Sequence, residues 1–596
     1  MTFFGILALE KETCGPVLAV LETFIRSLPE GDSLYNRYDI SGKTFVYMDK
    51  RANRLVESDS RTYLGFFNKQ LNASNTEGID WSDINSVLDK LIGGFFFIRY
   101  GPSGLSVYCD PNGIQQIYYL EKDGYLVLSD DLKLLASWPG YRKELNLPAV
   151  DSFISSETNS FAETFFKGIF RIEPGEKIEL CGTGLKTGKY WDLVFPEEKT
   201  KAGLPETVEA LNLSFFQVMQ RYLANRNPDY ALMLSGGIDS NFILAMLVRA
   251  GSGPVKTFTI GYGSEEQYYS DEIPGARISS KHFRTDHEEV LFSRNDFEEV
   301  LFGDYTRIMD EPNGNIANLA LVFTKRRMAG RINNVLTGLG PDTFFYSNPN
   351  DFRYHRLYSL LKFLDSTGAG RVLEFLKTEL SRMAPFDYRL NRVFFTRRGY
   401  IRGVKTKSEF NQYIKYKLYS PLMLEVKRKT ELIYDELVEN HLKAVGERTE
   451  ISDKMAYVDL KMVILRNFVN SSCQIFQRSM IEYYVPYLDP AFMNEYAKVA
   501  EKNKFFSGRR KMLEVLMAEK YLPPEILFRK KQPFRVPHIR WINETFKEKM
   551  IQRALAGRTV DALFKRGALK HYLRSEHSAL LLWRLFLLEK WTDENF

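Results

Sequence analysis

The chain has 596 residues, and this length excludes a single ordinary domain, so we expect two or more. Its 81 basic and 75 acidic residues leave a net charge of +6, too balanced to indicate a nucleic-acid-binding protein. The four cysteines, Cys14, Cys109, Cys181 and Cys473, lie far apart without metal-ligand spacing. Free thiols in a reducing, cytoplasmic location are therefore expected.

Neither end of the chain predicts insertion into a membrane. The N-terminal sequence MTFFGILALEKE lacks the basic start of a signal peptide. The most apolar late segment, 579–588, is about half as long as a membrane span and contains Arg584. We therefore predict that the chain has no membrane span and that this segment forms a buried terminal helix.

Two regions with different patterns follow one another along the chain. The runs GGFFFIRY, LSVYCD and YLVLSD, all within residues 93–130, are short and bounded by turn-forming residues, which predicts a strand-rich domain. After a charged segment with prolines at 194–210, longer amphipathic runs such as 206–222 indicate α/β structure that becomes mostly helical. We predict domains at residues 1–195 and 205–596.

The sequence ALMLSGGIDSNFILAML, residues 231–247, interrupts an apolar run with a polar turn. Residues 230–234 predict a buried parallel strand, and residues 241–249 predict a helix whose start is marked by Asp239 and Ser240. A glycine turn between a strand and a helix makes an anion site, because the backbone can approach a phosphate and free N–H groups point at it.

The polar side chains of this turn suit phosphate chemistry. Ser235 and Ser240 can donate hydroxyl hydrogen bonds, and Asp239 can hold Mg²⁺ between phosphates. The pattern GxxxxGK[ST] does not occur here, so transfer of a γ-phosphoryl group is not indicated. A plain β–α turn with helix-capping residues is the alternative interpretation.

The segment SGGIDS resembles the pyrophosphate loop of enzymes that cleave ATP to AMP and pyrophosphate. Five later segments resemble motifs of the asparagine synthetase family in the same order: TFTIGYG, MDEPNGNIAN, NVLTGLGPDTFF, YYVPYLDP and LPPEILFRKKQPF. The resemblance implies an α/β synthetase domain with a parallel sheet, and ATP and Mg²⁺ as cofactors. It implies Asp239 and Asp342 as magnesium ligands, and a nucleotide site made of Met233, Ser235, Gly236, Gly237, Asp239, Ser240, Ile260, Thr337 and Gly338.

The segment RKKQPF carries one further expectation. By the register of Arg529, the resemblance implies that Lys531 rather than Lys530 is the catalytic lysine, where one ammonium serves both adenylation and amine attack. A solvated basic turn is the alternative interpretation of these residues, and the pair Arg509-Arg510 is interpreted as solvated surface.

The first region resembles the family's glutaminase domain through LIGGFFFIRY, CDPNGIQQIYYL, LVLSDDLKLLAS, RIEPGEKIEL and YWDL. The resemblance implies an α+β sandwich with α/β/β/α layers, of the N-terminal nucleophile type. The nucleophilic Cys is missing, because Thr2 follows Met1 and Phe4 falls at the nucleophile's register. Residues 64–67 replace the glutamine-binding segment, and Cys109 replaces an Arg and is interpreted as structural. This domain is predicted to be catalytically silent, with a nucleophilic Thr2 as the alternative.

A synthetase without a glutaminase needs another source of amine. β-Lactam synthetases and lasso peptide cyclases of this family use an amine in the substrate itself, and Leu339 stands where the former carry Tyr and asparagine synthetases carry Glu. We therefore expect an AMP-forming carbon–nitrogen ligase that cyclises a peptide, with no general base identified. A partner peptidase or leader-binding protein is expected beside the peptide, and no nucleic acid.

Three other functions remain open at this stage: an ammonia- or glutamine-dependent asparagine synthetase, a β-lactam-synthetase-like cyclase of a small molecule, and a nucleotide-binding module without catalysis. Enzymes that insert sulfur into tRNA share SGGxDS, but they need active cysteines and a basic face, and neither is visible here.

Overall fold

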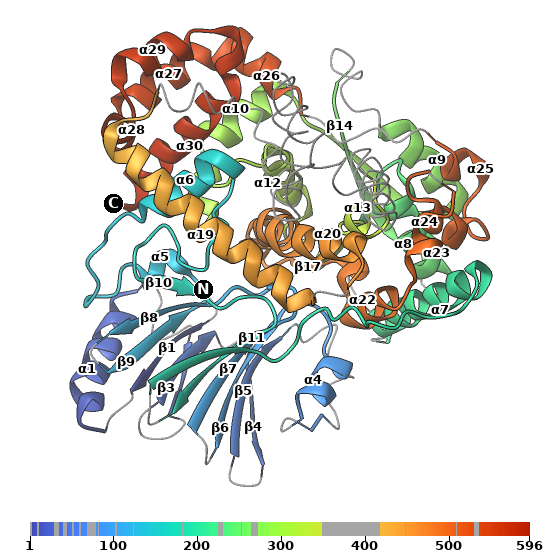
Figure 1. The fold of residues 1–596 in the computed structure, drawn as a ribbon, viewed down its shortest axis with the longest axis horizontal. Coiled ribbons are helices and arrows are strands. Elements are labelled where there is room, and N and C mark those ends of the chain that lie inside the picture. The colour runs from blue at the N-terminus through green and yellow to red at the C-terminus, as the bar shows by residue number, and fades with distance from the viewer. Residues whose placement is uncertain are drawn as a thin grey trace, which may run out of the picture.

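The computed structural model of the protein describes residues 3–8, 11–28, 35–39, 44–49, 53–58, 61–67, 79–80, 83–101, 104–122, 124–181, 184–224, 230–251, 253–263, 272–347, 418–446, 449–507, 509–529 and 536–596. Two stacked antiparallel sheets are followed by a parallel sheet wrapped in helices (Figure 1). Within these residues, no helix is long and apolar enough to cross a membrane. The cytoplasmic location stays a prediction.

The first half contains two six-stranded sheets, with orders β10-β8-β9-β1-β3-β2 and β12-β11-β7-β6-β5-β4. All the pairings are antiparallel. The strands are β1 (Phe3–Ala8), β2 (Tyr35–Asp39), β3 (Thr44–Asp49), β4 (Asn53–Ser58), β5 (Arg61–Phe67), β6 (Phe95–Gly101), β7 (Gly104–Cys109), β8 (Tyr118–Lys122), β9 (Tyr125–Ser129), β10 (Ile169–Arg171), β11 (Glu176–Cys181) and β12 (Gly184–Lys189).

Strand β6 explains how two sheets and two helices form four layers. Its residues alternate between faces, so Phe96 and Ile98 join the core between the sheets. Phe95 and Phe97 point to the other face and pack with Val87 of helix α4 (Ile84–Lys90). The run GGFFFIRY is therefore apolar on both faces because both are covered.

A second helix covers the outer face of the other sheet. Leu21 and Phe24 of α1 (Lys11–Ser27) lie in one buried cluster with Tyr118 and Val127 of β8 and β9. The layers are thus α/β/β/α, and the predicted fold class is confirmed. Two further helices, α5 (Leu132–Leu135) and α6 (Leu147–Ser156), lie between β9 and β10 in the chain.

The second half is built on a five-stranded sheet with the order β15-β14-β13-β16-β17 and four parallel pairings. The strands are β13 (Tyr230–Met233), β14 (Lys256–Gly261), β15 (Asp286–Leu291), β16 (Asn334–Thr337) and β17 (Glu482–Tyr484). The chain moves outward from β13 to β15 and then returns to β16 on the other side. The carboxyl ends of β13 and β16 therefore meet where the strand order reverses, the usual position of a ligand crevice in such sheets.

Helices pack around this sheet and against the sandwich. They include α7 (Leu204–Leu223), α8 (Ile238–Arg249), α9 (Ile273–Phe283), α10 (Arg294–Phe302), α11 (Tyr305–Ile308), α12 (Ala317–Met328), α13 (Pro341–Phe344), α19 (Pro421–Val445), α20 (Ile451–Asp459), a π-helix η1 (Leu460–Val469), α21 (Asn470–Gln477), α22 (Pro490–Ala497), α23 (Glu501–Lys504), α24 (Met512–Ala518), α25 (Pro524–Leu527), α26 (His538–Trp541), α27 (Lys547–Ala556), α28 (Arg558–Leu563), α29 (Arg566–Leu573) and α30 (Ala579–Asn595).

Helices α30 and α8 both cover segments for which the sequence predicts a helix. The apolar segment at 579–588 lies in α30, whose apolar side chains are buried, as predicted. The helix after β13 begins earlier than the residue 241 that the sequence predicts. Helix α8 begins at Ile238 with Gly237 as its N-cap, so Asp239 and Ser240 lie in the first turn, because a glycine rather than a polar side chain occupies the cap.

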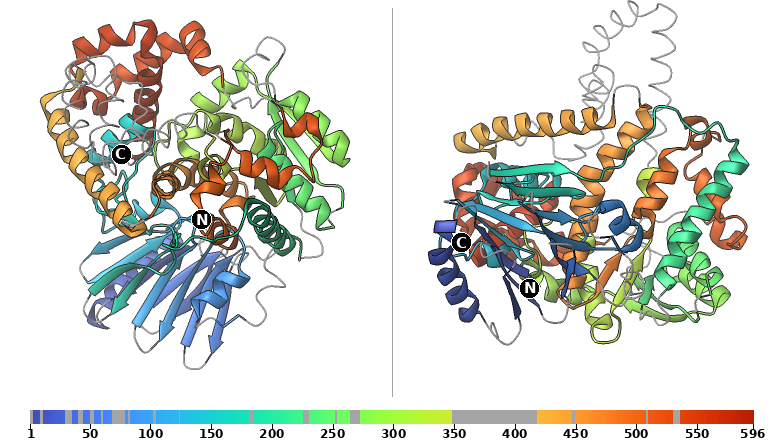
Figure 2. Two further views of the ribbon diagram at one scale, coloured as in Figure 1. Left: turned by 45° about the vertical axis from the view of Figure 1, so that its right-hand side comes forward. Right: turned by 90° about the horizontal axis from the view of Figure 1, so that it is seen from below.

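The helices around α20 lie between the sandwich and the parallel sheet (Figure 2).

The predicted boundary between the two domains, at residues 195–205, stays a proposal. Strand β12 ends at Lys189 and α7 begins at Leu204.

Candidate active site

The turn after β13 folds back on the first turn of α8. The backbone N–H of Ser235 donates to Ser240 Oγ (2.9 Å), and that of Gly237 donates to Ser235 Oγ (3.1 Å). The amide of Asn241 donates to the carbonyls of Ser235 (3.0 Å) and Gly237 (2.7 Å). Side chains of the segment itself therefore hold the loop in shape.

Two glycines allow other segments to approach this loop closely. A Cβ on Gly236 would lie 1.8 Å from Nη1 of Arg529, so the guanidinium lies directly against the loop. A Cβ on Gly338 would lie 2.8 Å from the backbone nitrogen of Ser240. The turn after β16 thus lies against the loop after β13, and a cation lies beside a loop suited to anions.

A cavity of about 270 Å³ opens at these strand ends. Its size is close to the lower end of small-molecule sites, about 300 Å³. Seven of the nine predicted nucleotide-binding residues line it: Met233, Ser235, Asp239, Ser240, Ile260, Thr337 and Gly338. Gly236 and Gly237 lie in the same loop but not in the lining. Phe258 and Asn315 add walls that the sequence did not predict.

A buried lysine joins the two predicted magnesium ligands. The ammonium of Lys511 forms ion pairs with Asp239, with Asp342 (2.7 Å) and with Glu514 (3.4 Å). Burial alone would lower the pKa of Lys511, but the three carboxylates raise it well above its ordinary value. The lysine therefore stays charged, and Asp239 and Asp342 converge on one cation position.

This convergence fits a magnesium ion held between protein and nucleotide. No group of three or more His, Cys, Asp or Glu able to hold a metal occurs in the part of the chain that the structure describes. Mg²⁺ is commonly bound by one or two carboxylates, with substrate phosphates and water completing its coordination. Asp239 and Asp342 match that pattern, and a bound Mg²⁺ would neutralise charge on pyrophosphate.

Lys511 is a site residue that sequence reasoning missed. It directly follows Arg509-Arg510, which are exposed as predicted, so local pattern gives no reason to separate it from them. The structure separates it through its backbone, because Lys511 has φ of 54° at the N-cap of α24. A non-glycine residue in the left-handed region is strained, and such strain clusters at functional sites.

A buried carboxyl lies beneath this cation. Burial and the nearby Asp239 raise the pKa of Glu514 to about 8. The hydroxyl of Tyr487 donates to Glu514 Oε1 (2.9 Å). The site thus places next to Lys511 a carboxyl group that can gain or lose a proton near neutral pH.

The predicted catalytic residue Lys531 and its neighbour Lys530 lie outside the described residues. Arg529, which sets their register, does lie against Gly236. The role of Lys531 stays a prediction.

A second cavity, of about 510 Å³, adjoins the first and shares Gly338, Leu339 and Phe468 with it. Its walls come from both halves of the chain: residues 155–158 and 160 of the first half, and parts of α13 and η1 of the second. Leu339 thus presents an apolar side chain at the junction of the two cavities. We call the larger one the acceptor cavity.

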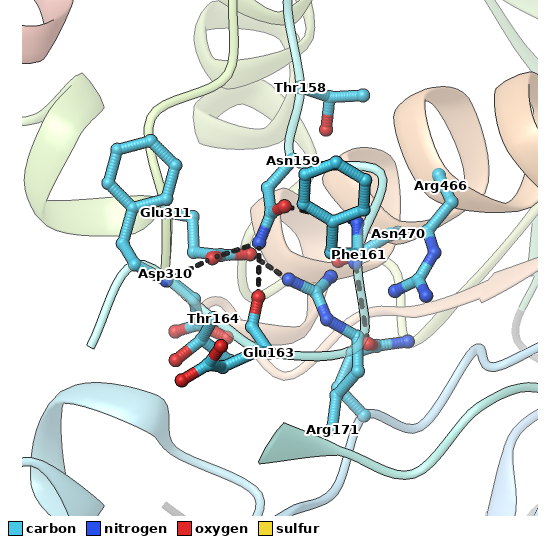
Figure 3. A network of polar contacts seen from close by, with 12 residues as sticks. Thr158, Asn159, Phe161, Glu163, Thr164, Arg171, Asp310, Glu311, Arg466 and Asn470 are labelled. Carbon is cyan, nitrogen blue, oxygen red and sulfur yellow. Dashed lines mark hydrogen bonds and ion pairs between the residues drawn. The ribbon is translucent and has the colours of Figure 1, made fainter. Parts of the chain in front are cut away.

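Polar contacts tie the first half to the loop at 309–318, which contributes Asn315 and Ala317 to the smaller cavity (Figure 3). Glu311 forms an ion pair with Arg171, and the two side chains are 11% and 2% exposed. Glu311 also accepts hydrogen bonds from the amide of Asn159 (3.0 Å) and the backbone N–H of Phe165 (2.7 Å). The sandwich half therefore holds one wall of the smaller cavity.

The expected glutaminase positions carry no activated nucleophile among the described residues. Phe4 pairs with Tyr47 and Ser129 inside β1, whereas Thr2 lies outside the described residues. Cys109 is buried and its thiol donates to the carbonyl of Gln115 (3.3 Å). Burial raises the pKa of Cys109 well above its ordinary value, so its thiolate, the nucleophilic form, is disfavoured.

Known protein families match both halves. The family described as asparagine synthase matches residues 220–593, and the glutamine amidotransferase domain matches residues 80–191. The chain belongs to the asparagine synthase family. As a member of it, the protein is an ATP-dependent, AMP-forming carbon–nitrogen ligase. The amidotransferase match begins after β1 and so does not reach Phe4.

Curated relatives are similar at low identity. The putative asparagine synthetase (glutamine-hydrolyzing) 2 of Methanocaldococcus jannaschii is 25% identical over 56% of this synthase-family chain and 67% of its own. The asparagine synthetase (glutamine-hydrolyzing) 1 of Bacillus subtilis is 23% identical, over 77% of this chain and 70% of the length of that relative.

Among solved structures, a glutamine phosphoribosylpyrophosphate amidotransferase of B. subtilis, complexed with ADP and GMP, is similar with 11% identity. The similarity covers 50% of this chain and 91% of that chain, with a TM-score of 0.21, which is too low to support an argument.

Proposed function

We propose that this synthase-family protein adenylates a carboxylate of a peptide and joins it to an amine of the same peptide, in a macrocyclisation of the lasso cyclase type. The observation that carries the proposal is the acceptor cavity, which meets the smaller cavity at Leu339. An apolar side chain at that junction can neither accept a proton nor bind ammonia.

The first step uses the smaller cavity. ATP would lie with its phosphates on the loop 235–240, close to Asp239, Lys511 and Arg529. The substrate carboxylate attacks the α-phosphate, an acyl–O–P bond forms and pyrophosphate leaves with the electron pair of the broken bond. Cations that face the leaving group stabilise the charge that develops on it.

The second step joins the acyl group to an amine. Enclosing both groups in one cavity raises their effective concentration, which replaces a bimolecular encounter by an intramolecular one. Since Phe4 stands at the nucleophile's register and Cys109 is buried, ammonia from glutamine is not the proposed amine. A partner peptidase or leader-binding protein would deliver the peptide.

An asparagine synthetase that uses ammonia or glutamine is the second candidate. It is favoured by the relatives from Methanocaldococcus jannaschii and Bacillus subtilis, which are named as asparagine synthetases and are 25% and 23% identical to this chain. The two candidates differ in their substrates. The asparagine synthetase needs aspartate and a separate small amine, whereas the macrocyclase needs a carboxylate and an amine in one molecule.

The test offers both acceptors to the full-length protein with ATP and Mg²⁺. One reaction contains L-aspartate with ammonium chloride or glutamine. The other contains linear peptides with a free N-terminal amine and an internal Asp or Glu, with the N-acetylated peptides as the matched control. The proposal expects loss of one water from the free peptides alone, detected by mass spectrometry. Asparagine formation without any cyclised peptide would overturn it.

A further inference from the structure

The acceptor cavity contains a carboxylate that has no role in the two proposed steps. Asp459 lines it, at the end of α20 and directly before the π-helix η1. π-Helical turns are rare and occur frequently at functional sites. The same cavity also contains Glu157 and Arg584, which pair with each other (2.7 Å).

The position of Asp459 is linked to the chemistry by one contact. The hydroxyl of Thr343 donates to Asp459 Oδ2, and Thr343 follows Asp342 on α13. One short helix therefore carries a proposed magnesium ligand and also orients the carboxylate of Asp459. Asp342 lies on α13, and Asp459 is hydrogen-bonded to α13. The fold therefore sets the distance between the activated acyl group and a group bound at Asp459.

The size and lining of the cavity indicate what it holds. A volume of about 510 Å³ is far larger than ammonia needs, since a water molecule takes up only about 30 Å³ in the liquid. Met455, Met462 and Phe468 give the cavity apolar walls near Asp459. The remaining walls are largely polar, so a carboxylate in this cavity suits a primary amine attached to a larger group with apolar and polar parts, such as a peptide.

We infer that Asp459 binds the attacking amine and accepts its proton. The amine nitrogen forms a bond to the acyl carbon, and the acyl–oxygen bond to AMP breaks with its electron pair going to the phosphate oxygen. The surplus N–H proton passes to the carboxylate of Asp459. This inference rests on the proposed function for the acyl partner, and it supplies the proton acceptor that Leu339 cannot provide.

Binding of a simple amine tests the inference without turnover. The probe is L-phenylalaninamide, and its N-acetyl derivative is the uncharged control. Isothermal titration uses the full-length protein with α,β-methylene-ATP and Mg²⁺. We expect saturable binding of the amine and binding of the N-acetyl compound weaker by about tenfold or more, the value of a charge-assisted hydrogen bond.

Two variants of Asp459 then locate the effect. Asp459→Asn should lose the preference for the amine and keep nucleotide binding and thermal midpoint, whereas Asp459→Glu should keep part of the preference. Asp561→Asn, an exposed residue paired with Arg566, is the matched control and should behave like the wild type. If Asp459→Asn does not fold, Thr343→Val should reduce the preference by withdrawing the orienting hydroxyl.

Equal binding of both probes to the wild type, or no binding of either, would overturn the inference. A preference retained in Asp459→Asn, or unchanged in Thr343→Val, would also overturn it. The failure of the proposed function looks different, because it would leave the amine preference in place while no peptide is cyclised.

Discussion

The two halves of the chain differ in which family features they retain: the first has the fold without the catalytic nucleophile, and the second has both the fold and the predicted site residues. The sandwich half keeps its layers and its buried core, but Phe4 stands at the register of the nucleophile. The synthetase half keeps the shaped loop at 235–240 and the paired carboxylates Asp239 and Asp342. Fold and chemistry are thus separable, since packing needs a pattern of apolar residues and catalysis needs a few specific side chains.

The sandwich half nevertheless touches the site. Through Glu311 and Arg171 it holds the loop at 309–318, and its residues 155–158 and 160 form part of the acceptor cavity. We therefore predict that the first half has no reaction of its own and helps to shape the site of the second.

The largest effect is expected from the paired carboxylates. Asp239→Asn and Asp342→Asn should each abolish the release of AMP and pyrophosphate, because each removes half of the proposed magnesium site. Loss of such an electrostatic group typically costs about a hundredfold to a thousandfold in rate. Asp561→Asn serves as the surface control in the pyrophosphate-release assay. Wild-type release by either variant would contradict the proposed site.

The next effect concerns Lys511. Lys511→Met should lower pyrophosphate release by about a hundredfold, since it leaves three carboxylates without their cation and removes a positive charge from the proposed phosphate site. Arg510→Met, at the exposed neighbour, should stay near the wild type. Steady-state kinetics at several Mg²⁺ concentrations provides the measurement. Similar small losses in both variants would make Lys511 a structural residue only.

A third pair of variants compares Lys531 with Lys530. Lys531→Ala should bind ATP almost normally yet lose product formation, whereas Lys530→Ala should be mild. Nucleotide titration and product assays separate binding from chemistry. Equal, small effects of both substitutions would support the alternative interpretation of this segment as a solvated basic turn.

A smaller effect on activity, but a clear one on stability, is expected where the halves meet. Arg171→Met leaves Glu311 buried without its partner, and breaking such a pair typically costs about 3–5 kcal/mol. The exposed pair Arg326–Glu299 is the control, because Arg326→Met should cost about 0–1 kcal/mol. Chemical denaturation measures the free energy of unfolding. The KM for ATP shows whether the loop at 309–318 still shapes the nucleotide site. An unchanged KM in folded Arg171→Met would show that the sandwich does not shape the nucleotide site.

The sequence predicted the parts that local pattern determines. A turn that is glycine-rich and polar after an apolar strand defines the phosphate loop, and seven predicted residues line the cavity beside it. The short apolar run GGFFFIRY, bounded by turn-forming residues, likewise predicts a strand. These features depend on neighbours in the chain, so they are visible without a structure.

The parts it could not predict depend on contacts between distant segments. Lys511 follows two exposed arginines in the sequence, but it has a left-handed backbone conformation and pairs with Asp239, which lies far away in the chain. Asp459 and Glu311 look like ordinary helix and loop acids. Their significance comes from Thr343 and Arg171, which lie more than a hundred residues away in the chain.

The contrast between the halves is tested most directly by following ATP and glutamine together in one reaction. The full-length protein, with ATP, Mg²⁺, glutamine and the free-amine peptides, is monitored by ³¹P and ¹H NMR. The account predicts AMP and pyrophosphate in equal amounts, no glutamate, and the same result for Thr2→Ala. Release of ADP, or glutamate that disappears in Thr2→Ala, would contradict it.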